Sequence, residues 1–217
     1  MHPRVPDSGP ETLAGLLAAR GIRDERVLDA FRRVPRAAFC PPEFEHLAYE
    51  DEVVPIAAGI TLSQPFVVAA MLEALRLRGE ERALDVGSGT GFTTALLCRL
   101  VRQVCALESD EVAARVAEER LVGIGFRNFA IHCGDGWRGW PEMSPFSAIL
   151  VSAAVPEPPP ALLAQLAPGG RIVVPVGGTD GQMLEAWWRD PTRGPALSRR
   201  LFPVRFVPLL PEDEMRD

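Results

Sequence analysis

The chain has 217 residues, of which 47% are hydrophobic, with a formal net charge of −6, and all 23 of its basic side chains are arginines. This length and composition predict one globular domain with a sizeable core. The acidic balance disfavours a general nucleic-acid binder, which would carry a basic stripe. The absence of lysine excludes Schiff-base, pyridoxal phosphate and P-loop chemistry.

The sequence shows no sign of a metal site, a leader or a membrane span. The cysteines form no C-x-x-C pair and the histidines have no metal-ligand spacing, so we expect reduced thiols and no bound metal. The first residues lack the apolar core of a signal peptide, and no run of about 18 apolar residues occurs. We therefore expect a cytoplasmic monomer with neither membrane nor nucleic acid as partner.

The N-terminal part is predicted to be helical. Residues 1–10 are rich in Pro and Gly and are expected to be a flexible terminus. Apolar residues at helical spacing predict two helices, at 11–20 and 24–34. Gly21 stops the first helix and Asp24 caps the second.

The next segment leads into the main part of the domain. One helical turn is predicted at 43–47, and 48–56 reads as extended chain or loop. Helical spacing of Val and Leu then predicts a helix at 64–77. We group residues 11–60 as a small helical appendage on the substrate side of a single domain that spans 11–210.

Strands and helices alternate in the rest of the chain. The predicted strands are 82–86, 103–108, 128–133, 146–152, 171–176 and 183–188. The predicted helices are 92–100, 110–122 and 161–166, followed by a polar loop at 190–198, a last apolar stretch at 201–209 and an acidic tail at 211–217. Repeated βα units predict an α/β fold of the Rossmann-like, doubly wound type. Its mainly parallel sheet has helices on both faces and at least one antiparallel C-terminal strand.

A glycine-rich turn joins the first of these strands to the first of these helices. Gly87, Gly89 and Gly91 follow a G-x-G-x-G spacing, which differs from the dinucleotide motif and from the P-loop. Such a turn lets a ligand approach bare backbone at a helix N-terminus. The carboxylate of Asp85 favours a ligand with an ammonium group, such as S-adenosylmethionine, over a pyrophosphate. A purely structural turn is the alternative.

Two acidic residues end the next two strands. Glu108 lies about twenty residues beyond the glycine turn, where a carboxylate can bind both hydroxyls of a ribose. Asp135, between Gly134 and Gly136, is placed to accept a hydrogen bond from an adenine amino group. A solvated Glu and an Asx turn are the structural alternatives. With the glycine turn, these acids favour S-adenosylmethionine over NAD.

Ser63 is the main catalytic candidate. It precedes Gln64-Pro65 and a predicted helix, so an ordinary N-cap is the alternative role. Both roles are compatible, because a capping hydroxyl at a cleft is a rigid donor. The strand at 146–152 ends in Ser-Ala-Ala and lacks the Asn/Asp-Pro-Pro-aromatic signature of methylation on amino groups. This disfavours a DNA or RNA amino methyltransferase.

Several segments resemble the protein-L-isoaspartate O-methyltransferase family of class I S-adenosylmethionine-dependent methyltransferases. They are Val34-Pro-Arg36, Ala48-Tyr-Glu-Asp51, Gly59-Ile-Thr-Leu-Ser-Gln-Pro65, Asp85-Val-Gly-Ser-Gly-Thr-Gly91, Gly134-Asp-Gly136, Ala153-Ala-Val-Pro156 and Val204-Arg-Phe-Val-Pro-Leu209. Many methyltransferases share the glycine motif, whereas the segments at 61–65 and 204–209 are far more specific.

The resemblance implies methyl transfer from S-adenosylmethionine to the α-carboxylate of L-isoaspartyl residues in damaged proteins, with S-adenosylhomocysteine as product. The ester then closes to a succinimide, which can reopen to aspartate. Ser63 is the implied active-site residue. The implied cofactor contacts are Thr61, Leu62, Asp85, Gly87, Ser88, Gly89, Gly91, Glu108, Asp135 and Gly136, and the implied substrate contacts are Ile60, Gln64 and Val207.

Other functions stay open at this point. Ile60 stands where the family commonly carries Gln or a small residue, which keeps open a paralogue that methylates an Asp of one dedicated peptide. A non-catalytic module that binds S-adenosylmethionine is a third possibility, against which the complete set of site residues counts. An NAD oxidoreductase is disfavoured by the glycine spacing.

Overall fold

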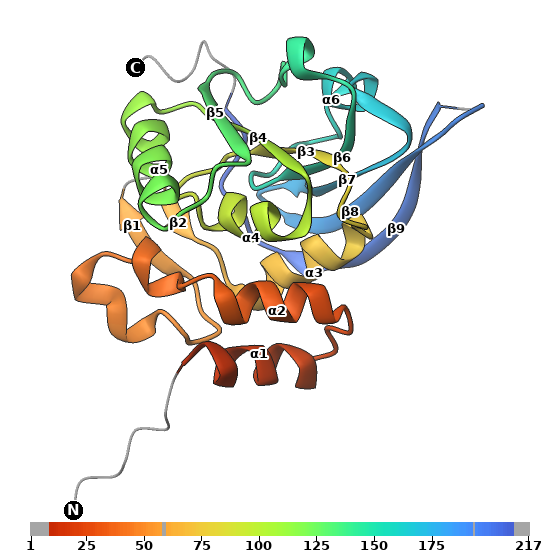
Figure 1. The fold of residues 1–217 in the computed structure, drawn as a ribbon. Coiled ribbons are helices and arrows are strands. Elements are labelled where there is room, and N and C mark those ends of the chain that lie inside the picture. Colours follow the sequence, from red (N-terminus) through yellow and green to blue (C-terminus); the bar gives the residue numbers. More distant parts are fainter. Residues whose placement is uncertain (1–8, 58–59, 193, 211–217) are drawn as a thin grey trace, which may run out of the picture.

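The computed structural model describes residues 9–57, 60–192 and 194–210. Within these residues the centre is a seven-stranded sheet with the order β5-β4-β3-β6-β7-β8-β9 (Figure 1). Its strands are β3 (Arg82–Val86), β4 (Gln103–Glu108), β5 (Phe129–Cys133), β6 (Phe146–Val151), β7 (Leu166–Gly178), β8 (Gly181–Asp190) and β9 (Gly194–Val204). The five strands from β5 to β7 pair in parallel, and β8 pairs antiparallel with β7 and β9. The predicted fold class is therefore confirmed.

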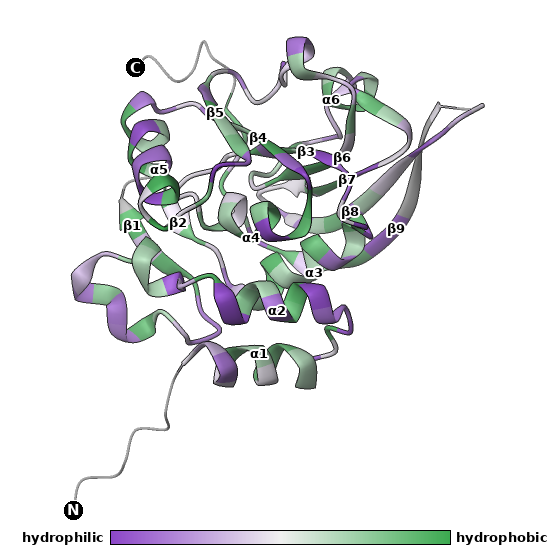
Figure 2. Cartoon of the chain, viewed as in Figure 1, coloured by the Kyte–Doolittle hydropathy of each residue, from purple (hydrophilic) through white to green (hydrophobic). Residues whose placement is uncertain are grey.

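Helices cover both faces of the sheet. They are α1 (Pro10–Ala19), α2 (Glu25–Arg33), α3 (Pro65–Leu75), α4 (Phe92–Leu100), α5 (Glu111–Gly123) and α6 (Pro160–Ala164). One core, which includes Leu17 and Leu96, joins the N-terminal helices and α4 to one face. A second core, which includes Ile149 and Leu162, lies between the other face and α6. Hydrophilic and hydrophobic residues are interspersed along α2 and α5, as expected for helices with one face on the core (Figure 2).

The segment between α2 and α3 is more structured than predicted. Two 3-10 helices, η1 (Arg36–Phe39) and η2 (Pro42–Leu47), precede an antiparallel pair of short strands, β1 (Val54–Ala57) and β2 (Ile60–Leu62). Only the turn at 43–47 and the extended chain at 48–56 were expected. β2 brings the Thr-Leu-Ser segment to the edge of the main sheet, where the site lies.

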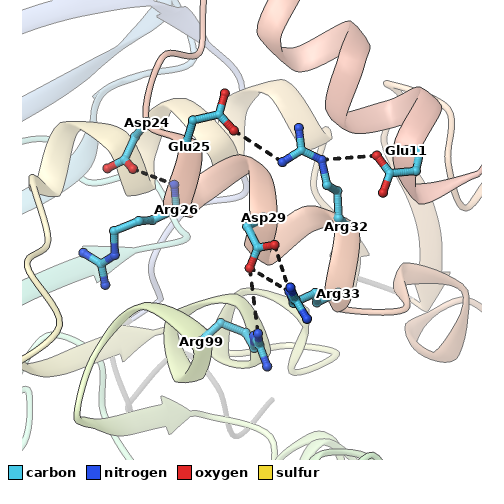
Figure 3. A network of polar contacts seen from close by, with 8 residues as sticks. All are labelled: Glu11, Asp24, Glu25, Arg26, Asp29, Arg32, Arg33 and Arg99. Carbon is cyan, nitrogen blue, oxygen red and sulfur yellow. Dashed lines mark hydrogen bonds and ion pairs between the residues drawn. The ribbon is translucent and has the colours of Figure 1, made fainter.

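Local capping rules held at two helices. The Asp24 side chain accepts a hydrogen bond from the N–H of Arg26, and the Asp110 side chain accepts one from Ala113 at the start of α5. Exposed ion pairs also link α2 to its neighbours, as between Arg32 and Glu11 at 3.3 Å (Figure 3). Such exposed pairs contribute little stability each, so the apolar core holds the N-terminal helices in place.

The C-terminal part corrects three predictions. α6 ends at Ala164, two residues before the predicted end, because Leu166 already pairs with Phe146 as the first residue of β7. The strand predicted at 171–176 therefore begins earlier, at Leu166. Its pairing with β6 is irregular between Phe146 and Ala148. The prediction of a polar loop at 190–198 was wrong, since Gly194 pairs with Asp190 and is the first residue of β9. A proline is tolerated in β9 because this is an edge strand.

The terminal predictions fall partly outside the described residues. Residues 1–8 and 211–217 are not described, while Pro10 already begins α1. The division into an appendage at 11–60 within a domain at 11–210 stays a prediction. Among the described residues, none of the helices is long and apolar enough to span a membrane.

Candidate functional site

A cavity of about 390 Å³ opens at the carboxyl ends of β3, β4 and β6, where the β2 segment and the C-terminal segment meet the sheet. Ligands bind at this edge of open α/β sheets because the strands present their loops there. The predicted site residues that line it are Ile60, Thr61, Leu62, Ser63, Gly87, Ser88, Gly89, Glu108, Gly136 and Val207. Four predicted residues do not line it: Gln64, Asp85, Gly91 and Asp135.

The glycine turn forms one wall of the cavity. Gly87, Gly89 and Gly91 have φ values of 80°, 52° and 88°, which other residues rarely adopt. The backbone N–H groups of Gly87 and Ser88 donate to the carbonyl of Leu107, which fixes the turn against β4. A Cβ on Gly91 would lie 3.2 Å from the Cβ of Ala117, so this glycine allows α4 to approach α5. Its contribution to the site is the close packing of these helices.

Glu108 is held rigidly at the end of β4. The residue is only 8% exposed. Its Oε2 accepts a hydrogen bond of 2.7 Å from the N–H of Gly89. Oε1 accepts from the N–H of Ser109 at 2.8 Å. Backbone donors hold a carboxylate in place without neutralising it, so an anionic acceptor is fixed in the cavity wall before any ligand binds.

Two buried polar atoms of the glycine-turn region have no hydrogen-bond partner among the described residues: Oδ1 of Asp85 and Oγ of Ser88. The other carboxylate oxygen of Asp85 accepts from the Thr94 hydroxyl at 2.6 Å. Burial raises the pKa of the Asp85 carboxyl to about 7, and the nearby charge of Glu108 adds to the rise. Unpartnered buried polar atoms are rare, and free acceptor oxygens in and behind the glycine turn suit a ligand with an ammonium group. These residues therefore fit S-adenosylmethionine.

Asp135 adopts the structural alternative considered for it. Its Oδ1 accepts a hydrogen bond of 2.8 Å from the N–H of Trp137, which is an Asx turn, and the residue lines a neighbouring cavity of about 490 Å³. Gly136 does line the main cavity. A Cβ there would lie 2.7 Å from Cγ1 of Val86 and 2.9 Å from Cδ1 of Leu209, so only glycine fits this wall. The adenine contact of Asp135 stays a prediction.

Ser63 lines the cavity without acting as a helix cap. The N-cap residue of α3 is Gln64, which makes no side-chain cap, so Ser63 does not take the N-cap role considered as its alternative. Oδ1 of Asp51 accepts instead from the N–H of Phe66 at 2.8 Å. The Gln64 amide donates to the carbonyl and Oδ2 of Asp51, at 3.0 and 3.2 Å, and so turns away from the cavity. Helix capping therefore makes no demand on the Ser63 hydroxyl.

Ile60 covers the glycine turn from β2. Its Cγ2 lies 3.9 Å from the position that a Cβ on Gly89 would take. A branched apolar side chain at this place shields the turn from water. The role of Ile60 toward a peptide stays a prediction.

Some lining residues were not predicted. Ser152 and Ala153 follow β6, and Leu209 and Leu210 come from the C-terminal segment. The N–H of Leu209 donates to the carbonyl of Ala154 at 2.8 Å, which attaches this segment beside the end of β6. The strand-end rule that selected Glu108 and Asp135 would also have selected Ser152. The C-terminal segment reaches the cavity through contacts with residues far away in the chain, and no local sequence pattern indicates such contacts.

Few charged side chains line the main cavity. Among the described residues, no group of three His, Cys, Asp or Glu side chains is arranged to hold a metal ion. The acids at the cavity are Glu108 and Asp110. The site therefore offers backbone, hydroxyl and carboxylate groups in a confined space, which suits the alignment of two reactants.

Comparisons with known proteins agree with this arrangement. A profile of the family described as protein-L-isoaspartate(D-aspartate) O-methyltransferase matches residues 10–214. The protein-L-isoaspartate O-methyltransferase 1 of Anaeromyxobacter sp. strain Fw109-5 is 52% identical over 199 residues, which cover 91% of this chain and 93% of that protein. A protein-L-isoaspartate O-methyltransferase of Roseiflexus sp. strain RS-1 is 47% identical over 196 residues, covering 90% of this chain and 88% of the relative.

The fold also matches a solved structure over nearly the whole chain. A crystal structure described as a protein-L-isoaspartate O-methyltransferase of Plasmodium falciparum, in complex with S-adenosyl-L-homocysteine, aligns with a TM-score of 0.82 at 27% identity. The alignment covers 94% of this chain and 99% of that chain.

Proposed function

The chain belongs to the protein-L-isoaspartate O-methyltransferase family, and we propose that it methylates the α-carboxylate of L-isoaspartyl residues in damaged proteins. The methyl ester closes to a succinimide that can reopen to aspartate, so methylation initiates repair. The observation that carries the proposal is that Ser63, the glycine turn and Glu108 line one cavity.

S-adenosylmethionine supplies an electrophilic methyl group on a sulfonium and leaves as S-adenosylhomocysteine. On this chain, we propose that Glu108 binds the ribose hydroxyls and that the backbone from Gly87 to Gly89 receives the methionine end. The carboxyl of Asp85 lies buried behind that turn, and a nearby ammonium group would favour its ionised form. Thr61, Leu62 and Gly136 complete the walls.

The acceptor needs no general base. A peptide carboxylate has a pKa of about 3.5 to 4, so it is ionised at neutral pH and already nucleophilic. The end of β6 offers Ser152 and Ala153 rather than an acid, in keeping with this chemistry. Catalysis then consists of aligning the reacting atoms and excluding water. We propose that the Ser63 hydroxyl donates to the attacking carboxylate, and that Ile60 and Val207 border the bound peptide.

The proposal is tested by Ser63→Ala. One hydrogen bond to a charged group is worth about 1.5 to 3 kcal/mol, so kcat on an isoaspartyl peptide should fall about 10- to 100-fold. The affinity for S-adenosylhomocysteine, measured by calorimetry, should stay within about twofold. The matched control is Ser144→Ala, a serine hydroxyl that bonds the carbonyl of Pro141 outside the cavity. An unchanged kcat in Ser63→Ala would remove this residue from the mechanism.

Three further properties are proposals that follow from the family and the composition. We propose that the protein acts in the cytoplasm, works as a monomer and takes isoaspartyl peptides rather than nucleic acid as partners. The net charge of −6 supports the last point, because a polyanion would be repelled.

A further inference from the structure

Arg36 is the largest almost fully buried side chain among the residues that the structure describes. It belongs to η1, is 1% exposed and leads the set of large side chains that are under 2% exposed. Burial lowers the pKa of its guanidinium to about 10. Within the described part of the chain, no carboxylate forms an ion pair with it. A buried charge without a counter-ion is expensive and calls for a specific explanation.

The two terminal nitrogens of the guanidinium donate to backbone carbonyls instead of acids, while the buried Nε has no partner among the described residues. Nη1 donates to the carbonyl of Ala48 at 2.7 Å, with longer contacts of 3.4 and 3.5 Å to Leu47 and Glu50. Nη2 donates to Glu52 and to Ser63, both at 3.1 Å. The planar fork therefore binds the segment at 47–52 with one nitrogen and both that segment and Ser63 with the other.

The same side chain contacts the cofactor side of the site. Its Cζ lies 5.7 Å from the ring centroid of Phe92, which is the first residue of α4 and lines the cavity. Phe31 and Phe39 pack edge-on against this ring at 5.8 and 5.4 Å between centroids. Arg36 thus lies between the backbone that carries Ser63 and the helix that follows the glycine turn.

We propose that Arg36 is a positioning residue that sets the place of Ser63 relative to the glycine turn through its fork of carbonyl hydrogen bonds. The inference rests on the proposed function, because it assigns to Ser63 the contact with the isoaspartyl carboxylate. Arg36 itself does not line the cavity, so it acts through the Ser63 backbone. A displacement of about 1 Å in such a group can cost about 100-fold in rate.

A substitution that keeps the positive charge of Arg36 but removes its planar fork separates a positioning role from a role of the charge alone. Arg36→Lys keeps a positive charge, but an ammonium at the end of a flexible stem cannot bind Ser63 and the 47–52 segment with two fixed parallel nitrogens. We expect kcat on an isoaspartyl peptide to fall at least about 10-fold. The affinity for S-adenosylhomocysteine should change less than about threefold, since Glu108 and the glycine turn are untouched.

Arg26 provides the matched control. It is an exposed residue of α2 whose Nη1 and Nη2 also form a fork, donating to the carbonyls of Leu77 and Leu100 at 2.8 and 2.6 Å. Those carbonyls follow α3 and end α4, away from Ser63 and the glycine turn. Arg26→Lys should lower the melting temperature while kcat, measured well below that temperature, stays within about twofold.

The outcomes separate this inference from the function. A wild-type protein that leaves the isoaspartyl peptide unmethylated would overturn the proposed function and the inference with it. An active wild type with an equally active Arg36→Lys would overturn only the inference, as would an equal loss of kcat in Arg26→Lys. A large loss of kcat with retained S-adenosylhomocysteine affinity in Arg36→Lys alone would support it.

A second measurement uses the wild-type chain in case Arg36→Lys fails to fold. In NMR spectra of the guanidinium nitrogens, the two Nη signals of Arg36 should be resolved, because five carbonyl contacts prevent rotation of the fork. They should shift when isoaspartyl peptide is added to the protein saturated with S-adenosylhomocysteine, and not with the matched aspartyl peptide. Averaged signals, or signals that ignore the peptide, would overturn the proposal.

Discussion

Oε2 of Glu108 accepts a hydrogen bond of 2.7 Å from the backbone N–H of Gly89, which lies 19 residues earlier in the chain. This bond joins the end of β4 to the glycine turn after β3. The carboxylate and the turn therefore form one rigid unit in the chain alone. Preorganisation of this kind favours ligand binding because few groups must be ordered when the ligand arrives.

Glu108→Gln should weaken the binding of S-adenosylhomocysteine about 10-fold or more. An amide accepts hydrogen bonds at only one end, so its NH2 group would face either the N–H of Gly89 or that of Ser109. The proposed charge-assisted bonds to the ribose hydroxyls are lost as well, at about 1.5 to 3 kcal/mol. Isothermal titration calorimetry measures the change. Glu118→Gln, an exposed carboxylate on α5, is the charge-matched control, and equal affinities for both variants would refute the role of Glu108.

Gly136→Ala should damage the cavity wall. The added Cβ would stand 2.7 Å from Val86 and 2.9 Å from Leu209, and both side chains pack in the second core. Overpacking of this kind costs about 1 to 3 kcal/mol, and a displaced Leu209 would also narrow the cavity. Denaturant unfolding and S-adenosylhomocysteine titration should both report a loss.

The control for Gly136 is Gly123→Ala at the end of α5, where an added Cβ meets nothing within 4 Å. This change should be neutral or stabilising by up to about 1 kcal/mol, because alanine favours the helix. If the Gly136→Ala protein were as stable as Gly123→Ala, the side chains of Val86 and Leu209 could move aside, and the requirement for glycine would be refuted.

Asp85 makes stability depend on pH. Burial raises the pKa of its carboxyl from 3.8 to about 7 in the folded chain, so the folded state binds the proton more tightly than the unfolded state. The stability contributed by this group is fully present below about pH 4 and is lost as the pH rises through 7, on the order of 4 kcal/mol in all. Asp85→Asn, which still accepts from Thr94, does not titrate. Its stability relative to wild type should therefore increase between pH 4 and pH 7. Urea unfolding across this range tests the sign, and a difference independent of pH would contradict it.

Asp51 caps α3 from outside the helix, and its replacement should loosen the Ser63 segment. In Asp51→Asn the amide can still accept from Phe66, but its NH2 group cannot accept from Gln64 and Arg20, as the carboxylate does. We expect a loss of about 1 to 2 kcal/mol in the free energy of unfolding. Glu119→Gln on the exposed side of α5 removes one charge without such contacts and should change stability by less than about 0.5 kcal/mol. Equal stability of the two variants would argue against the capping role.

Local patterns identified the part of the fold where we propose that the cofactor binds. The predicted bounds of β3, α4 and β4 agree with the structure because strand and helix periodicity change abruptly at the glycine turn. Glu108 was predicted as a site residue because it is an acidic residue at the end of a predicted parallel strand. These signals lie within a few residues of one another, so a sequence pattern can carry them.

Predictions failed where a distant residue took over a local role. Ser63 has the sequence signature of an N-cap, yet Asp51, which lies 15 residues before Phe66, provides the cap. The loop predicted at 190–198 has Pro and Gly, but pairing with β8 makes it part of an edge strand. Arg36 belongs to a segment that carried the family resemblance, but its carbonyl partners lie 11 to 27 residues away. Tertiary contacts of this kind override local preference.

Methyl transfer to two matched peptides is the most direct test of the proposed activity. The purified protein is incubated with labelled S-adenosylmethionine and either an L-isoaspartyl peptide or the same sequence with normal aspartate. We predict labelled, base-labile methyl ester on the isoaspartyl peptide and about background label on the aspartyl peptide. Equal labelling of both peptides, or label on neither, would contradict it.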